Sequence, residues 1–106
     1  MAWIYLFVAG LLEIVWAYSM KQSMGFTRLG PSVVTVGAMI ASFWLLALAM
    51  RSLPLGTAYT IWTGIGAVGA FVLGVTLLGE SLSPVRVLAA CLIVSGLVLM
   101  KLSATT

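Results

Sequence analysis

Four long apolar stretches, separated by short polar segments, dominate the pattern of this chain. A membrane-spanning helix needs about 20 predominantly apolar residues. The stretches predict spans at about residues 2–20, 31–50, 55–78 and 84–100. The first stretch lacks a basic segment before it, so we interpret it as a retained helix and not as a cleaved signal. We therefore expect an all-α membrane protein in which residues 1–106 form a single four-helix domain.

Prolines and short connections support this arrangement. Pro31, Pro54 and Pro84 each stand at or just before the start of a predicted helix, where proline is tolerated. The connections, at residues 21–30, 51–54 and 79–83, are all short. Short connections make neighbouring helices antiparallel.

Composition excludes several classes of protein. The chain is 63% hydrophobic and 7% charged, whereas a soluble domain carries about 25% charged residues. The net charge of +3 comes from scattered Lys and Arg without a basic cluster, which gives no sign of nucleic-acid binding. The chain has no His and one cysteine, Cys91, so neither a metal site nor a disulfide is predicted. We interpret Cys91 as a small packing residue.

The Lys and Arg residues give almost no orientation signal. Four spans place both termini and the 51–54 loop on one side, with Arg51 and Lys101 there. Lys21, Arg28 and Arg86 lie on the other side. The orientation of a membrane protein follows the difference in Lys and Arg between the two sides. Here one side has two such residues and the other has three. Either the chain takes one weakly specified orientation, or copies insert both ways and pair as an antiparallel, dual-topology homodimer. A second copy would also supply the inverted repeat that many transporters contain.

Glu13 is the acid at membrane depth. It lies inside the first apolar stretch, with no Lys or Arg in that stretch to neutralise it. Such a carboxylate costs at least about 2.5 kcal/mol to insert, and an intramembrane ionisable group is a functional-site hypothesis by default. The other acid, Glu80, is interpreted as a solvated loop residue. Glu13 is therefore the candidate for binding a proton or a cation.

Helical spacing adds hydroxyl and aromatic groups to this candidate. Trp16 lies one turn from Glu13, and Ser42 shares a face of the second span with Met39. In the third span Tyr59, Trp62 and Thr63 share a face. A carboxylate with aromatic rings suits a desolvated cation, including a guanidinium group. The open alternatives are that the aromatics only pack, and that Ser42 bonds the carbonyl four residues earlier in its own helix.

Small residues have two further interpretations. Six of the 11 glycines fall between residues 55 and 79, which indicates close packing or a bend; we favour a hinge at Gly64 and Gly66. The G-x-G-x-x-G match at residues 64–69 lies inside an apolar span, without the βαβ unit a nucleotide site needs. Ala89 and Gly96 form a small-residue stripe on the fourth span, a candidate dimer contact.

These residues together resemble a known family. Residues 10–17, 25–28 and 53–67 are similar to small multidrug resistance transporters over nearly the whole length. The pair Glu13-x-x-Trp16 and the run 62–67, Trp-Thr-Gly-Ile-Gly-Ala, are most like the guanidinium-exporter subtype. The resemblance implies an antiparallel dimer of four-helix subunits in the bacterial inner membrane. It also implies that Glu13 binds both proton and substrate, with Trp16, Tyr59, Trp62 and a supporting hydroxyl on Ser42.

One position departs from the subtype. Guanidinium exporters usually have Ala where this chain has Thr60. Thr60, with Thr63 and Met39, is therefore a possible modulator of specificity.

We expect a non-enzymatic antiporter that exports guanidinium cations, driven by an inward proton gradient and without any cofactor. Its partners would be small organic cations, protons, the lipid bilayer and a second copy. One alternative is broader export of quaternary ammonium compounds and hydrophobic cations. A second is an accessory membrane subunit that uses Glu13 for helix pairing. Lipid flipping and simple channel activity are less favoured. Arg86 lies at the start of its span and can reach the interface, so no Lys or Arg at membrane depth would hold a phosphate, and the predicted cavity would retain its ion.

Overall fold

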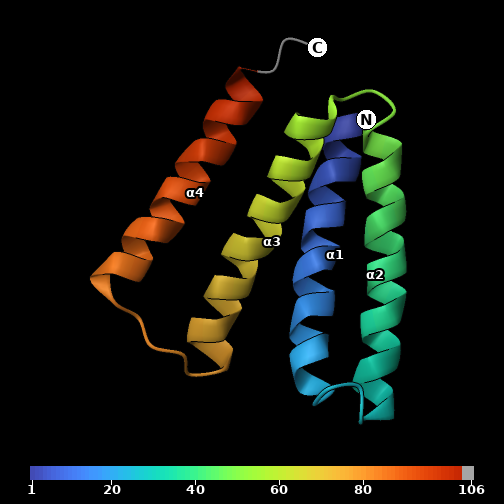
Figure 1. The fold of residues 1–106 in the computed structure, drawn as a ribbon, viewed down its shortest axis with the longest axis vertical. Helices are drawn as coiled ribbons and strands as arrows, with labels where there is room; N and C mark the ends of the chain where they lie inside the picture. Colours follow the sequence, from blue (N-terminus) through green and yellow to red (C-terminus); the bar gives the residue numbers. More distant parts are fainter. Residues whose placement is uncertain (104–106) are drawn as a thin grey trace.

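Four long helices make up the fold, in a computed structural model that describes residues 1–103. They are α1 (Ala2–Gln22), α2 (Leu29–Ala49), α3 (Leu55–Leu77) and α4 (Pro84–Leu102). Each is long and apolar enough to cross a membrane. The helices run up and down in sequence, and the α2–α3 connection lies at the same end as the start of α1 and the end of α4 (Figure 1). The predicted all-helical class and the four spans are confirmed.

One helix boundary differs from the predicted one. α2 begins at Leu29, two residues before Pro31, so the connection from α1 is shorter than residues 21–30. Pro31 fits inside the first turn because the N–H groups of that turn have no intrahelical acceptor. Pro54 is the N-cap residue of α3, and Pro84 is the first residue of α4.

Glycines bring α1 and α3 into close contact. A β-carbon at Gly10 would lie 2.7 Å from Cγ2 and 2.8 Å from Cβ of Ile65. Further along the same contact, Gly69 leaves room for the side chain of Ile14. Small residues allow membrane helices to approach in this way. The buried apolar core lies among α1, α2 and α3 and consists of Leu6, Ala9, Leu46, Ala49, Leu53, Ala58, Ile61 and Trp62.

The fourth helix stands apart from this unit. The backbone of α4 lies close to that of α3 alone, and none of its residues is buried. Its contact with α1 is made by side chains, where Lys101 lies over the ring of Trp3. Figure 1 shows it leaning away from α1 and α2. Gly64 of α3 admits Leu97 of α4, while Ala89 and Gly96 are exposed. The stripe predicted as a dimer contact is thus uncovered in one chain, and its role stays a prediction.

The glycine-rich part of α3 is helical throughout. α3 runs without a break from Leu55 to Leu77. Gly66 faces α1, and Gly64 faces α4. Close packing, one of the two interpretations of the glycine density, is therefore what this conformation contains. The hinge at Gly64 and Gly66 stays a prediction.

We expect Gly10→Ala to destabilise the protein by about 1–3 kcal/mol, the usual cost of overpacking a well-packed contact. The added methyl group would overlap the Cβ of Ile65, which is fixed to the α3 backbone. The measurement is the thermal unfolding midpoint in detergent micelles. Gly37→Ala in α2 is the matched control, because nothing lies within 4 Å of its added methyl group. Equal midpoints for the two variants would contradict the packing argument.

Candidate functional site

Glu13 lies where α1 crosses α3. Its carboxyl group rests directly against Gly66, and a β-carbon at that position would overlap it. Oε1 of Glu13 is buried and has no hydrogen-bond partner among residues 1–103. A buried polar atom left without a partner costs about 1–3 kcal/mol, more when charged. The site therefore presents an acceptor that a proton, a cation or another chain can satisfy.

Trp16 lies one turn further along α1. Its indole Nε1 is also buried, and within the described part of the chain it has no acceptor. Acceptor and donor thus both stand without partners on one face of one helix. Sequence spacing predicted that Glu13 and Trp16 share a face, and the structure agrees in placing both at partly buried positions.

Ser42 joins three helices. Its hydroxyl donates to the carbonyl oxygen of Ala9 on α1, at 2.7 Å. It also accepts from Nε1 of Trp62 on α3, at 3.0 Å. The alternative that Ser42 bonds its own helix is wrong, because its proton goes to α1. The hydroxyl fixes the orientation of the Trp62 ring, and the Ala9 carbonyl it engages lies one turn before Glu13.

Four aromatic rings form a continuous row from α1 to α3. Phe43 meets Trp16 with ring centres 6.3 Å apart and Trp62 with centres 5.7 Å apart, both edge to face. Tyr59 extends the row, with its ring centre 5.5 Å from that of Trp62. The predicted aromatics Trp16, Tyr59 and Trp62 are therefore brought together.

Phe43 is the residue that sequence reasoning missed. It bridges the aromatic residues of α1 and α3, a role that its position after Ser42 does not reveal. The available signal is its place four residues after Met39, which puts both on one face of α2. We had placed Ser42 on the same face as Met39, and Phe43, the residue after Ser42, was not included.

The possible modulators of specificity are Thr63, Thr60 and Met39. The Thr63 hydroxyl donates within its own helix, to the carbonyls of Tyr59 and Thr60. Thr60 lines a groove of about 410 Å³ between α3 and α4, which also contains Thr63, Gly64 and Gly96. Met39 is half-buried on α2. Thr60 therefore borders the uncovered stripe of α4, and its effect on specificity stays a prediction.

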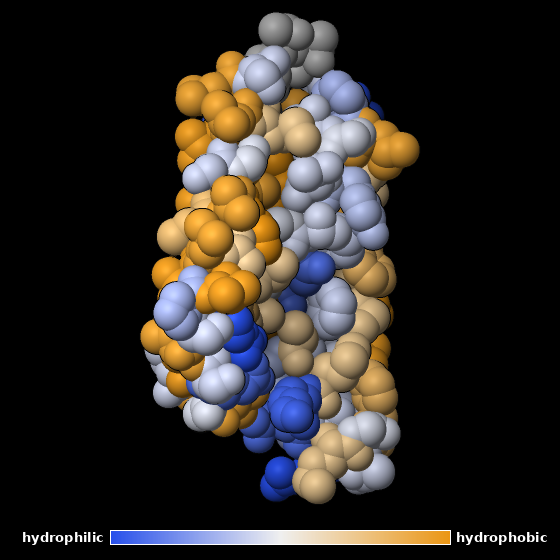
Figure 2. Space-filling model, turned by 60° about the vertical axis from the view of Figure 1, so that its left-hand side comes forward, coloured by the Kyte–Doolittle hydropathy of each residue, from blue (hydrophilic) through white to orange (hydrophobic). Residues whose placement is uncertain are grey.

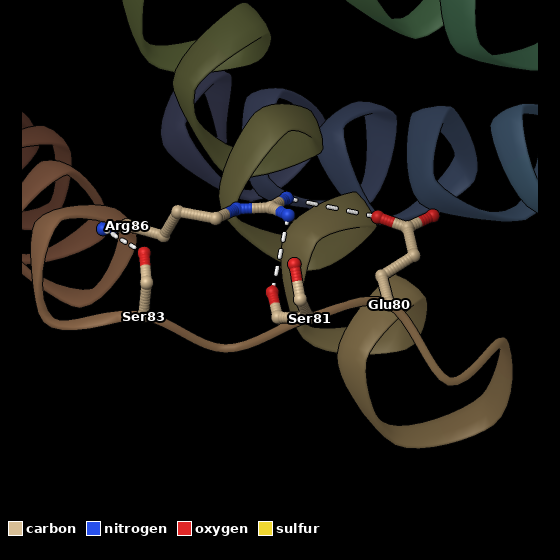
Figure 3. Close-up of polar contacts among 4 residues, drawn as sticks. All are labelled: Glu80, Ser81, Ser83 and Arg86. Carbon is tan, nitrogen blue, oxygen red and sulfur yellow. Dashed lines mark hydrogen bonds and ion pairs between the residues drawn. The ribbon is translucent and has the colours of Figure 1, made fainter.

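Glu80, the second acid, belongs to the α3–α4 connection. Its carboxylate lies 3.7 Å from the guanidinium of Arg86, and both side chains are more than two-fifths exposed. Arg86 also donates to the carbonyl of Ser81, and its backbone N–H donates to the hydroxyl of Ser83, the N-cap of α4 (Figure 3). An exposed pair of this kind contributes about 0–1 kcal/mol. Glu80 thus orders a loop, and Glu13 stays the single acid within the spans.

The molecular surface shows the same division. Hydrophilic residues gather at one end of the molecule and in a hollow at mid-height, and largely hydrophobic surface borders them (Figure 2). Within residues 1–103, no group of three or more His, Cys, Asp or Glu side chains could hold a metal ion.

A four-span bundle with one carboxylate at membrane depth defines a multi-pass membrane protein, and comparison with known proteins names its family. A model of the Small Multidrug Resistance protein family matches residues 1–105. The chain belongs to the small multidrug resistance family, whose members in bacteria are multi-pass transporters of the inner membrane.

Close relatives agree with this assignment. The chain is 60% identical over 103 residues to a guanidinium exporter of Escherichia coli (strain K12), covering 97% of this chain and 98% of the relative. It is 59% identical over 103 residues to a guanidinium exporter of Citrobacter freundii, with the same coverage. A guanidinium exporter of Salmonella typhimurium (strain LT2) is 59% identical over 104 residues, covering 98% and 99%. The predicted family is confirmed.

We expect Ser42→Ala to lower the free energy of unfolding by about 1–3 kcal/mol, because the buried Nε1 of Trp62 loses its acceptor. The carbonyl of Ala9 loses the serine donor and keeps its donor within α1. Thermal unfolding in micelles measures it. Ser32→Ala is the matched control, since its hydroxyl bonds only the carbonyl of Arg28 in an exposed turn. The double variant Ser42→Ala/Trp62→Phe also lacks the indole N–H. Its loss of stability should therefore be smaller than the sum of the losses in the two single variants. Strict additivity would show that the bond contributes nothing.

Proposed function

We propose that this chain is a proton-coupled antiporter that exports guanidinium and guanidinyl cations across the bacterial inner membrane. The observation that carries the proposal is the carboxyl group of Glu13, with one buried oxygen unpartnered, beside the row of aromatic rings. The names of the close relatives, guanidinium exporters, support the same substrate class.

The groups at the site suit a flat cation with N–H donors. A guanidinium ion can donate two parallel hydrogen bonds to a carboxylate, which would satisfy Oε1 of Glu13. The faces of aromatic rings attract a cation by about 0.5–2 kcal/mol. Quaternary ammonium ions have no N–H donors, so they would bind through charge and ring faces alone. Broader export of such cations is therefore the second candidate, and the exposed ring of Tyr59 and the threonine at position 60 support it.

Coupling follows from having one carboxylate for two ligands. Glu13 can hold a proton or a guanidinium ion, and each excludes the other. If the empty charged site changes its facing slowly, an inward flow of protons exchanges for an outward flow of cations. Apart from the transfer of a proton to and from the carboxylate, this exchange makes and breaks no covalent bond, so it needs no cofactor and no enzymatic step.

The working unit in this proposal is an antiparallel homodimer. Within residues 1–103, a single chain leaves Glu13 Oε1 and Trp16 Nε1 unpartnered and leaves every residue of α4 unburied. A second copy, packed against the stripe of Ala89 and Gly96, would cover α4 and bring two Glu13 residues to one cavity. The two ends of the bundle carry two and three basic residues, and so small a difference permits both orientations.

We expect Glu13→Gln to abolish guanidinium-driven currents in proteoliposomes on a solid-supported membrane, because the amide can neither titrate nor balance the cation. Glu80→Gln is the matched control, since it removes the other acid from an exposed loop pair and should keep the current. Tetramethylammonium tests the second candidate in the same experiment. A proton-driven guanidinium current that survives in Glu13→Gln refutes the scheme.

Dual topology has its own test. In a Cys91→Ser background, Ser103→Cys and Ser81→Cys place single thiols at opposite ends of the bundle, at exposed positions. An impermeant maleimide applied to intact cells should label about half of the copies in each variant. Full labelling of one variant and none of the other would establish a single orientation and exclude the antiparallel dimer.

A further inference from the structure

A second concave surface lies on the side of α3 that faces away from Tyr59 and Thr63. Residues two apart on a helix point about 160° away from each other. Ile61 and Ile65 therefore point away from Tyr59 and Thr63. The two isoleucines form the floor of a groove between α1 and α4, with a volume of about 330 Å³.

The groove is apolar along its length and cationic at one end. Phe7 of α1 and Val98 of α4 are among its walls. At the end of the groove the ammonium of Lys101, in the last turn of α4, lies 4.3 Å from the ring centre of Trp3, in the first turn of α1. Trp and Lys are the residues that typically stand at the level of lipid headgroups. The groove therefore runs from the headgroup level into the hydrocarbon region.

No carboxylate within residues 1–103 balances Lys101. Glu13 lies at mid-helix, and Glu80 follows the far end of α3, next to the start of α4. Arg51, on the α2–α3 connection, stands at the same end as Lys101 (Figure 1). This end of the bundle thus carries only positive side chains among the described residues. The contact with the Trp3 ring leaves the N–H donors of the ammonium available to an anion.

We propose that this groove is a binding site for an anionic phospholipid, with one acyl chain over Ile61 and Ile65 and the headgroup phosphate at Lys101. Apolar contacts alone would not distinguish this lipid, because bulk acyl chains are as apolar as the groove. The positive end supplies the selectivity, at about fivefold in affinity for each Lys or Arg near the surface.

The position of the groove favours a lipid over a second copy of the chain. The stripe proposed as the dimer contact, with Gly96, borders a separate groove, on the face of α3 that carries Thr60 and Thr63. A dimer assembled on that face leaves the Ile61–Ile65 groove facing the bilayer. The lipid site depends neither on the identity of the transported cation nor on its coupling to protons.

Native mass spectrometry of the purified full chain tests the proposal. The protein is released from micelles that contain equal amounts of dioleoyl phosphatidylglycerol and dioleoyl phosphatidylcholine, and the lipid adducts are counted. We expect phosphatidylglycerol adducts to exceed phosphatidylcholine adducts severalfold. Lys101→Gln should lower this ratio about fivefold, because it removes the charge and keeps a polar side chain at the interface.

Two further variants keep the outcome decisive. Val98→Phe should reduce adducts of both lipids, because it adds bulk to the groove wall. Arg86→Gln is the matched control, since it removes a positive charge at the opposite end, and it should leave the ratio unchanged. The proposal is overturned if Lys101→Gln retains the wild-type ratio, or if Arg86→Gln lowers it equally. It is also overturned if Val98→Phe changes the oligomeric mass and not the adducts, since the groove would then be an interface between copies.

Discussion

The carboxyl group of Glu13 is the constraint to which the rest of the structure responds. A charge at membrane depth is costly, so the carboxyl group must pack against protein and must not be exposed to the hydrocarbon of the bilayer. Gly66 of α3 provides that contact, because only a residue without a side chain admits the carboxyl group. The crossing of α1 and α3 is therefore set by the acid and by the glycines on both sides of it, Gly10 and Gly69.

Ser42 extends this constraint to α2. Its bonds to the Ala9 carbonyl and to Nε1 of Trp62 join α1, α2 and α3 one turn from the acid. In an apolar medium such bonds have no competing water, and a buried network rigidifies when all of its members are satisfied. α4 takes no part in the network, and its backbone lies close to that of α3 alone. The chain is thus a three-helix unit that shapes the site, together with one helix whose surface is free for another chain.

The sequence predicted what depends on period and composition. The four spans, the shared face of Glu13 and Trp16, and the proximity of Tyr59 to Trp62 all follow from apolar length and helical spacing. Contacts between helices do not follow from either. The ring of Phe43 packs against aromatic rings of two other helices, and the Ser42 hydroxyl donates to a carbonyl on α1 and not to one in its own helix. The glycine density of α3 indicated close packing or a bend, and we favoured a hinge, whereas a single conformation contains only the packing.

The hydrogen-bond inventory at the site limits how a substrate can be recognised. Trp16 Nε1 is a donor only, so it can meet an anion or an acceptor and not an N–H group of guanidinium. The Ser42 oxygen donates to Ala9 and already accepts from Trp62, which leaves it one further lone pair. The carboxylate of Glu13 is therefore the main acceptor for N–H donors in one chain. In the proposed exporter, discrimination between guanidinium and quaternary ammonium ions then depends on how fully the carboxylate can use both oxygens.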